Sequence, residues 1–310
     1  MQESAAPPKT EEQGRPAATG TLRSWMLACR PATLTCSIAP VLVGTACAFA
    51  HRAFRLGPAL AALFGAIAIQ IGTNLANDVA DFLKGADNSE RLGPVRAAQA
   101  GLLSPAAVRT GAIVAFSLAA LAGLYLVFSA GPILIAVGLA SILCGVAYTA
   151  GPYPLGYHGL GELFVLLFFG FVAVCGTAYV QMGSVPVLAV WASIPAGALS
   201  SAVLVVNNLR DRDTDAKAGK RTLAVRLGVQ AAVAEYALLV AAAYAAPLVI
   251  AVLWRNPWAL LPLVTLPRGI QLARRAARAK GRELNPVLAN TAKLLLWHSL
   301  LFAGGIMRGS

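Results

Sequence analysis

Long apolar runs, separated by short polar links, dominate this 310-residue chain from residue 32 onward. Nine of them come near the roughly 20 residues that an α-helix needs to cross a bilayer. The eighth run is the weakest, because Pro257, Pro262 and Pro267 interrupt it. The pattern predicts an all-α, polytopic membrane protein with nine transmembrane helices. The predicted spans are 32–50, 57–77, 106–128, 131–150, 160–180, 185–207, 229–253, 257–273 and 287–307.

Composition agrees with a membrane protein. Apolar residues make up 58% of the chain and charged residues 12%, whereas soluble domains carry about 25% charge. The first residues are polar, contain Pro7, Glu11 and Pro16, and lack an apolar run. We therefore expect a disordered N-terminal tail over 1–22 and a single transmembrane domain over 23–310.

Basic residues are concentrated in the links after the second, sixth and eighth runs. With nine spans these links share one side, which the positive-inside rule makes cytoplasmic in a multi-pass cell-membrane protein. The net charge of +12 is better explained by anionic lipid and a phosphorylated substrate than by nucleic acid, because no soluble domain would present it to a duplex. The basic residues of these links are Lys84, Arg91, Arg96, Arg210, Arg212, Lys217, Lys220, Arg221, Arg226, Arg274, Arg275, Arg278, Lys280 and Arg282.

All six aspartates lie in two short segments, 74–87 and 207–215, and each segment lies where a long apolar run ends. An ionised carboxylate near hydrocarbon costs several kcal/mol unless it is neutralised. Both segments fall on the side predicted to be cytoplasmic. Clustering of acids at the ends of apolar helices therefore points to bound cations.

The polar residues of each segment recur at helical spacing, so each set shares one face of a helix. On the second predicted helix this face continues inward to two amide side chains. We expect the two polar faces to oppose each other at matching depth. The first set is Gln70, Asn74, Asn77, Asp78 and Asp81, and the second is Asn208, Asp211 and Asp215.

Carboxylates converging in a poorly hydrated cavity repel one another unless cations neutralise them. Magnesium suits such oxygen ligands, and each ion takes only one or two carboxylates besides water and phosphate oxygens. Two acidic faces are therefore consistent with about two or three Mg²⁺ ions bridging a diphosphate. The alternative, solvated loop acids paired with nearby arginines, leaves the paired asparagines and the helical register unexplained.

Basic side chains interleaved with the acids point to the same anionic ligand. Lys84 and Arg91 follow the first segment, and Lys217, Lys220 and Arg221 follow the second. Such side chains can hold a diphosphate leaving group that metal ions already bridge.

The chain resembles the UbiA superfamily of intramembrane prenyltransferases, which carries an Asn-Asp-x-x-Asp motif after helix two and an Asp-x-x-x-Asp motif after helix six. The resemblance extends over essentially the whole chain beyond the tail. It is greatest to the naphthoate branch, the 1,4-dihydroxy-2-naphthoate polyprenyltransferases. The stretches that carry it are Arg30-Pro31-Ala-Thr-Leu, Asn77-Asp78 through Asp81, Lys84-Gly-Ala-Asp87, Arg91-Leu-Gly-Pro94, Tyr148-Thr-Ala-Gly-Pro-Tyr153, Asn207-Asn208-Leu-Arg-Asp211 and Gly219-Lys220-Arg221.

Two positions depart from the wider superfamily pattern. Many members place a third acid four residues after the second, where this chain has Gly85, and its third acid is Asp87. That spacing resembles the naphthoate branch rather than the hydroxybenzoate branch. A Tyr-x-x-x-Lys element of some relatives is also absent, since Pro152 stands four residues after Tyr148. Tyr148, Tyr153 or Tyr157 can instead contact substrate by hydrogen bonding.

The resemblance implies that a polyprenyl diphosphate ionises with Mg²⁺ assistance and that its allylic cation is captured by 1,4-dihydroxy-2-naphthoate, with loss of carbon dioxide and diphosphate, giving demethylmenaquinol. Asn77 and Asn208 would orient the metal ligands or touch phosphate, and Asp213 lies off the shared face. Gln70 and Asn74 would contact the acceptor or hydrogen bond between helices. The implied metal ligands and catalytic residues are Asp78, Asp81, Asp87, Asp211 and Asp215.

Two alternatives stay open. A relative of the same superfamily could use another aromatic acceptor. From a different class, an ion-coupled secondary transporter also carries intramembrane acids and asparagines. Transporters, however, usually place coupling acids near the midplane, whereas these acids lie at helix ends beside Lys and Arg. That placement favours a phosphorylated substrate.

Overall fold

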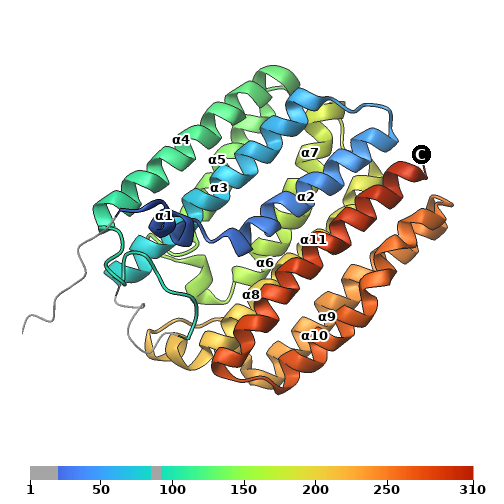
Figure 1. Ribbon diagram of the computed structural model, residues 1–310. Helices are drawn as coiled ribbons and strands as arrows, with labels where there is room; N and C mark the ends of the chain where they lie inside the picture. Colours follow the sequence, from blue (N-terminus) through green and yellow to red (C-terminus); the bar gives the residue numbers. More distant parts are fainter. Residues whose placement is uncertain (1–19, 85–91, 310) are drawn as a thin grey trace, which may run out of the picture.

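A computed structural model describes residues 20–84 and 92–309 of the chain. Within these ranges all regular secondary structure is helical, which confirms the all-α prediction. The long helices run side by side as a bundle, with α4, α3, α2 and α11 in sequence across the view of Figure 1. The elements are α1 (Leu22–Cys29), α2 (Pro31–Ala50), α3 (Leu56–Leu83), α4 (Pro105–Ala130), α5 (Ile133–Ala147), η1 (Leu155–His158), α6 (Gly161–Val165), η2 (Leu166–Val172), α7 (Ala173–Met182), α8 (Val187–Lys217), α9 (Leu223–Leu253), η3 (Pro257–Thr265), α10 (Leu266–Arg278), η4 (Gly281–Glu283) and α11 (Leu284–Arg308).

Seven of the described helical segments are long and apolar enough to cross a membrane, so the predicted count of nine is not confirmed. The fourth predicted span is the 15-residue helix α5, about 22 Å long and shorter than the hydrocarbon core. The eighth is divided between the 3₁₀-helix η3 and the amphipathic helix α10. Pro262 lies inside η3, and its missing N–H removes a bond that an α-helix would need there.

Local signals define several helix ends. Ser104 caps α4, its hydroxyl accepting a hydrogen bond from the Ala107 amide, and Pro105 occupies the first turn, where its lack of an N–H costs nothing. Gly131 ends α4 with φ of 110°, a conformation that favours glycine. Of greatest functional importance, α3 and α8 continue beyond their apolar runs, to Leu83 and Lys217. The described acids of both segments, Asp78 and Asp81 on α3 and those of α8, consequently lie on bundle helices instead of in loops.

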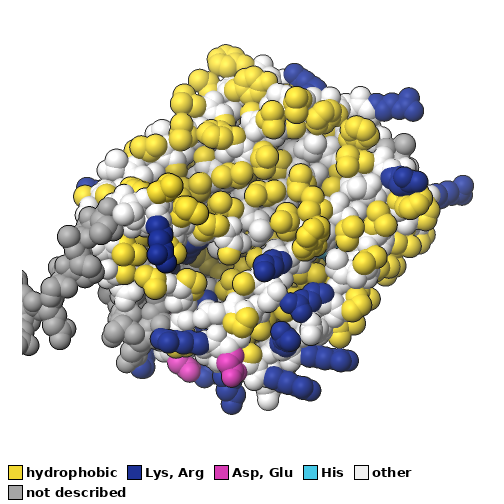
Figure 2. All heavy atoms as spheres, in the orientation of Figure 1, with side chains coloured by type: hydrophobic (Ala, Val, Ile, Leu, Met, Phe, Trp, Pro, Cys, Tyr) yellow, Lys and Arg dark blue, Asp and Glu magenta, His cyan; other side chains and the backbone are white. Residues whose placement is uncertain are grey.

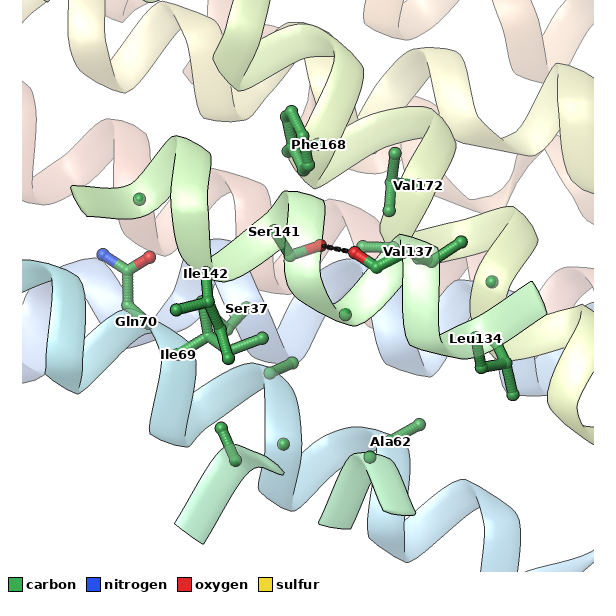
Figure 3. Close-up of a pocket in the computed structure, with 18 of the residues that line it drawn as sticks. Ser37, Ala62, Ile69, Gln70, Leu134, Val137, Ser141, Ile142, Phe168 and Val172 are labelled. Atoms are coloured by element: carbon green, nitrogen blue, oxygen red, sulfur yellow. Dashed lines mark hydrogen bonds between the residues drawn. The ribbon is translucent and has the colours of Figure 1, made fainter. Parts of the chain in front are cut away.

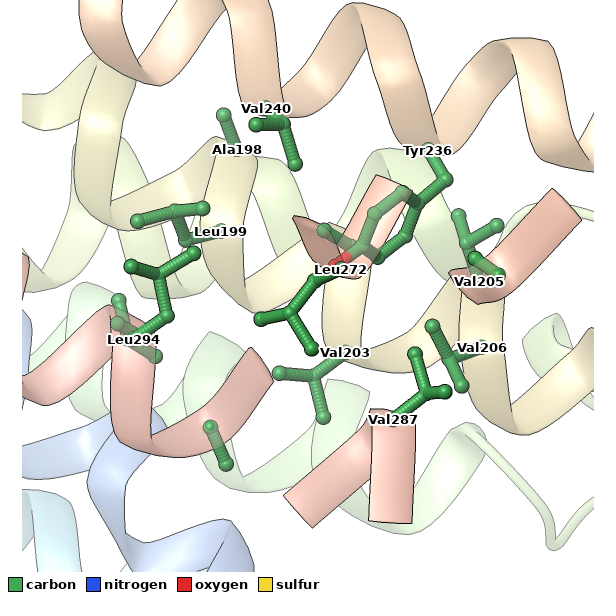
Figure 4. Packing of buried hydrophobic residues seen from close by; sticks show 14 of the residues in the cluster. Ala198, Leu199, Val203, Val205, Val206, Tyr236, Val240, Leu272, Val287 and Leu294 are labelled. Atoms are coloured by element: carbon green, nitrogen blue, oxygen red, sulfur yellow. The ribbon is translucent and has the colours of Figure 1, made fainter. Parts of the chain in front are cut away.

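The best-packed part of the bundle surrounds α8. A buried cluster joins α8 to α9 and α11 and includes Leu199, Val203 and Leu294 (Figure 4). The Tyr236 hydroxyl, which is buried there, lies 2.9 Å from Thr291 Oγ1 and so has a polar partner inside the apolar core. This packing fixes the helix that carries the second acidic segment.

Segments α6, η2 and α7 together form one membrane-spanning segment, interrupted in the middle by the π-helical turn η2. Gly170 of this turn and Gly197 of α8 meet closely: a Cβ on Gly197 would lie 3.0 Å from the Gly170 Cα and 2.8 Å from the Leu166 carbonyl oxygen. Only residues without a side chain allow the two backbones to approach in this way.

Candidate active site at the ends of α3 and α8

The described acids and asparagines of the first segment lie on the last turns of α3, and their side chains are buried. Asp78 is 1% exposed and Asp81 3% exposed. Deeper on the same face, Asn74 donates to the Cys29 carbonyl at 3.0 Å and to Thr33 Oγ1 at 2.9 Å, and Gln70 donates to Asn74 Oδ1 at 3.3 Å. Asn74 therefore has the interhelical role that the sequence left open, joining α3 to the start of α2.

The backbone and side chains that follow α3 engage both acids. The Ala97 amide donates to Asp78 Oδ2 at 3.1 Å, and Arg96 Nη2 lies 3.1 Å from Asp81 Oδ2 with both side chains buried. The other oxygen of Asp81 accepts from the Tyr157 hydroxyl at 3.0 Å and lies 3.2 Å from Lys220 Nζ. Both acids are therefore held by polar partners from outside α3.

The second acidic segment lies on the last turns of α8, and the burial of its acids depends on the face of the helix: the side chain of Asp215 is 13% exposed and that of Asp213 is 79% exposed. Asn208 is buried and donates to Glu162 Oε1 at 2.6 Å. Asp211 is 7% exposed and accepts two bonds from Arg210, at 2.8 and 2.6 Å. Asp213 pairs with Arg212 on the surface, where its side chain is 79% exposed. The prediction that Asp213 lies off the shared face agrees with this exposure.

Lys220 joins the two segments. Its ammonium nitrogen lies 3.2 Å from Asp81 Oδ1 and 3.7 Å from Asp215 Oδ1, so one positive charge is held between an acid of α3 and an acid of α8. The predicted convergence of the two polar faces is therefore present in the structure. Figure 2 shows Lys and Arg side chains gathered at this end of the molecule, while apolar side chains cover much of the rest of the visible face.

The loop between α5 and α6 covers the acids from the side. Thr149 Oγ1 donates to Asn77 Oδ1 at 2.7 Å, and Lys84 donates to the Thr149 carbonyl at 2.6 Å. Further along, Tyr153 is 58% exposed and stacks on the His158 ring at 3.6 Å between centroids. Burial, followed by the nearby Glu162 carboxylate, raises the pKa of the Tyr148 hydroxyl, which therefore stays protonated and can donate a hydrogen bond.

An apolar cavity of about 460 Å³ leads away from the acids between α2, α3, α4, α5 and the α6 to α7 segment. Gln70 and Tyr148 line it on the side of the acids. Phe168 and Val172 of the π-helical turn, with Ile142 and Leu134 of α5, form apolar walls (Figure 3). A hydrophobic chain with a charged head would find matching surroundings at both ends.

The structure thus brings together most of the predicted site residues that it describes, although they form no ready-made metal cage: within 20–84 and 92–309, no three His, Cys, Asp or Glu side chains converge closely enough to hold an ion. Lys217 and Arg221 are exposed. Asp87 and Arg91 lie outside the described residues. The predicted residues near the converging acids are Asn77, Asp78, Asp81, Lys84, Tyr148, Asn208, Asp211, Asp215 and Lys220.

Several polar partners of the acids were not among the predicted site residues. Arg96 and Arg210, which pair with Asp81 and Asp211, are predicted only as basic residues of the links. Thr149, which bonds to Asn77, belongs to neither an acidic nor a basic motif. A stronger signal existed for Glu162, a lone acid at the start of an apolar run, which is 6% exposed and bonded to Asn208. A buried acid requires a polar partner, so its position in the sequence could have placed it at the site.

Comparison with known proteins identifies the class first. The UbiA prenyltransferase family matches residues 37–300, and the chain belongs to this family. A solved UbiA homolog from Aeropyrum pernix K1 superposes with a TM-score of 0.65 at 16% identity, covering 87% of this chain and 97% of that chain. A UbiA homolog from Archaeoglobus fulgidus bound to GPP and Mg2+ gives 0.63 at 16% identity, over 90% and 99%. These structures share the fold.

More similar sequences narrow the assignment within the family. A 1,4-dihydroxy-2-naphthoate octaprenyltransferase of Mycobacterium tuberculosis is 43% identical over 92% of this chain and 97% of its own length. The enzyme with the same name from Escherichia coli is 36% identical, over 92% and 95%. These relatives belong to the naphthoate branch, which is the branch that the motifs of this chain resemble.

Proposed function

We propose that this protein transfers a polyprenyl group from polyprenyl diphosphate to 1,4-dihydroxy-2-naphthoate, releasing carbon dioxide and diphosphate and giving demethylmenaquinol for menaquinone biosynthesis. The observation that carries the proposal is the meeting of two acidic helix ends, bridged by Lys220, beside an apolar cavity. The naphthoate octaprenyltransferases that resemble the chain over most of its length support the choice of acceptor.

The donor set of the site fits Mg²⁺. Its anionic side chains are carboxylates and its neutral ones include the amides of Asn77 and Asn208, all hard oxygen donors that magnesium prefers. The Lys220 ammonium between Asp81 and Asp215 also shows that these acids accept a shared cation. Asp78, Asp81, Asp211 and Asp215 would hold the metal, together with Asp87 from outside the described residues. When bound, Mg²⁺ would neutralise charge on the departing diphosphate.

The chain's own basic residues would bind the diphosphate directly. Lys84 lies at the end of α3 and Lys220 follows α8, and both stand at the edge of the acids, where cationic side chains can contact phosphate oxygens. As the allylic carbon–oxygen bond breaks, its electron pair leaves with the diphosphate, and these cations stabilise the charge that develops there. Arg91, Lys217 and Arg221 are further candidates by sequence position alone.

The new bond forms on the apolar side of the acids. The aromatic ring supplies an electron pair to the allylic carbon, and the carbon that bore the carboxylate regains its pair when carbon dioxide leaves, so the ring ends with a prenyl group in place of the carboxylate. Gln70 and the Tyr148 hydroxyl border this region and can orient the acceptor. The surrounding apolar walls exclude water that would otherwise capture the allylic cation.

The apolar cavity would hold the polyprenyl tail. It is lined by α4 and α5, and these helices also carry exposed apolar residues that do not line the cavity, such as Leu121 and Leu143. A tail of many isoprene units needs such a hydrophobic environment, since each exposed methylene would cost about 0.8 kcal/mol.

We also place the site on the cytoplasmic face of the cell membrane, because the basic links gather at that end. A cysteine substituted for the exposed Asp213 tests the orientation. It should react with a membrane-impermeant maleimide in inverted vesicles and stay unlabelled in intact cells. Labelling from outside intact cells would reverse the orientation.

The proposed reaction is tested with purified protein, Mg²⁺ and polyprenyl diphosphate, offered in turn with 1,4-dihydroxy-2-naphthoate, 4-hydroxybenzoate and homogentisate. We expect prenylated product and carbon dioxide with the naphthoate. Product from hydroxybenzoate alone would reject the naphthoate assignment while keeping the family. No product from any of the three aromatics would reject aromatic prenyl transfer.

A further inference from the structure

Tyr157, in the loop between α5 and α6, contacts charged groups of both acidic segments. Its hydroxyl donates to Asp81 Oδ1 at 3.0 Å. Over its ring lie two ammonium groups, Lys84 Nζ at 4.6 Å and Lys220 Nζ at 4.8 Å from the ring centroid. Lys84 ends the first segment and Lys220 follows the second. One side chain from a third element therefore gathers the basic residues of both.

The ring faces explain how two like charges can be kept close. An aromatic face attracts a cation within about 6 Å of its centroid, and both lysines satisfy that distance. Without the ring the two ammonium groups would retain only repulsion and their separate anchors. Those anchors are the Thr149 carbonyl for Lys84 and the carboxylates of Asp81 and Asp215 for Lys220.

The backbone fixes the ring in place. The Arg221 amide donates to the Tyr157 carbonyl at 2.8 Å, which ties the loop to the residue after Lys220. At the other end of the loop, Thr149 bonds to Asn77 on α3. The loop is thus attached to both segments independently of the Tyr157 side chain. A change confined to that side chain should leave these attachments intact.

We propose that Tyr157 is a positioning residue that holds Lys84 and Lys220 ready to receive the two phosphates of the prenyl donor, with its hydroxyl orienting Asp81. The inference rests on the proposed function, since it assumes that the lysines bind diphosphate. It assigns Tyr157 to the donor and not to the aromatic acceptor. The ring would hold the two lysines and the hydroxyl would orient Asp81, and the substitutions Tyr157→Leu and Tyr157→Phe distinguish these two roles.

Binding of inorganic pyrophosphate with Mg²⁺ to the full-length protein in detergent, measured by calorimetry, tests the ring without catalysis. Tyr157→Leu should weaken pyrophosphate binding about tenfold, because two cation–π contacts are lost. Tyr157→Phe keeps the ring and should bind within about threefold of the unchanged protein. Tyr125→Leu, a half-exposed tyrosine on α4, serves as the matched control and should bind normally.

Steady-state kinetics provide the second readout. In Tyr157→Leu the KM for polyprenyl diphosphate should rise about tenfold while the KM for the naphthoate stays within twofold. Tyr157→Phe should mainly raise the Mg²⁺ concentration needed for half-maximal activity, because Asp81 loses a hydrogen bond. A merely structural role would lower the amount of active protein without separating the two KM values.

The outcomes distinguish this inference from the proposed function. If the unchanged protein binds no pyrophosphate, the diphosphate site itself is wrong. If it binds but Tyr157→Leu binds equally well, or loses affinity for the acceptor instead, the role of Tyr157 is overturned. Should Tyr157→Leu fail to fold, Lys84→Met and Lys220→Met test the same arrangement, and normal pyrophosphate binding by both would overturn it.

Discussion

The two acidic segments carry similar polar side chains but differ in how deeply these are buried. On α3 the acids are almost fully enclosed, and Asp81 has polar partners from three other parts of the chain, namely Arg96, Tyr157 and Lys220. On α8 burial differs between faces: Asp211 and Asp215 are mostly buried, whereas the side chain of Asp213 is 79% exposed. We expect the first segment to be the fixed half of the site and the exposed face of the second to adjust more readily to an incoming charged group. Substitutions can test that difference.

The largest effect should come from the innermost acid of each segment. Asp78→Ala and Asp211→Ala should each lower turnover by about a thousandfold or more, because each removes a charge that balances the cations at the diphosphate. Product formation from polyprenyl diphosphate and naphthoate measures this. The protein should remain folded in membranes, and near-normal turnover in either variant would show that its segment does not hold the metal.

The next largest effect should be a difference in the free energy of unfolding between substitutions at the two segments. Arg96→Met leaves Asp81 with fewer partners at a buried position and should lower the free energy of unfolding by about 3–5 kcal/mol. Arg212→Met, which breaks the exposed pair with Asp213, should cost less than about 1 kcal/mol. Thermal unfolding in detergent compares the two. Equal losses would contradict the idea of a fixed and an adjustable half.

A smaller effect is expected at Asp215, which shares Lys220 with Asp81 at the longer distance of 3.7 Å. Asp215→Asn should raise the Mg²⁺ concentration for half-maximal activity about tenfold, since one carboxylate among several metal ligands is lost. Turnover at saturating Mg²⁺ should largely recover. A magnesium titration of activity measures both quantities, and an unchanged midpoint would remove Asp215 from the metal ligands.

The smallest effect is expected at Asp213. Asp213→Asn should change turnover and the Mg²⁺ midpoint by less than about twofold, because its carboxylate is solvated and pairs only with a surface arginine among its described contacts. The same titration that is used for Asp215→Asn provides the comparison. A loss matching that of Asp215→Asn would mean that the whole end of α8 turns inward when substrate binds.

Helical periodicity predicted those parts of the site that lie on helices. Asp78 and Asp81 share a buried face because positions three and four apart coincide on a helix, and the same rule placed Asp211 with Asp215. The convergence of the faces followed from their matching positions at the ends of predicted spans. The family assignment, which rested on these motifs, agrees with the matching family and relatives.

The geometry of the loop between α5 and α6 could not be predicted from helical periodicity. Thr149 and Tyr157 reach Asn77 and Asp81 through a connection without a repeating pattern, and its path is set by tertiary contacts. The number of membrane spans could not be predicted from the hydrophobic pattern either. That pattern does not reveal that the segment around Pro262 forms the 3₁₀-helix η3, or that α5 has only 15 residues. Hydropathy records which residues avoid water and not how the backbone crosses the bilayer.

The contact between Gly170 and Gly197 has a mechanical consequence for the distant acids. From Gly197, α8 continues without a break to Asp211, about 21 Å along its axis. A tilt of α8 by about 1° at Gly197 would displace Asp211 by about 0.4 Å. An added methyl group on Gly197 would press against the Leu166 carbonyl. We therefore expect this contact, far from the acids along α8, to influence how the two acidic helix ends align.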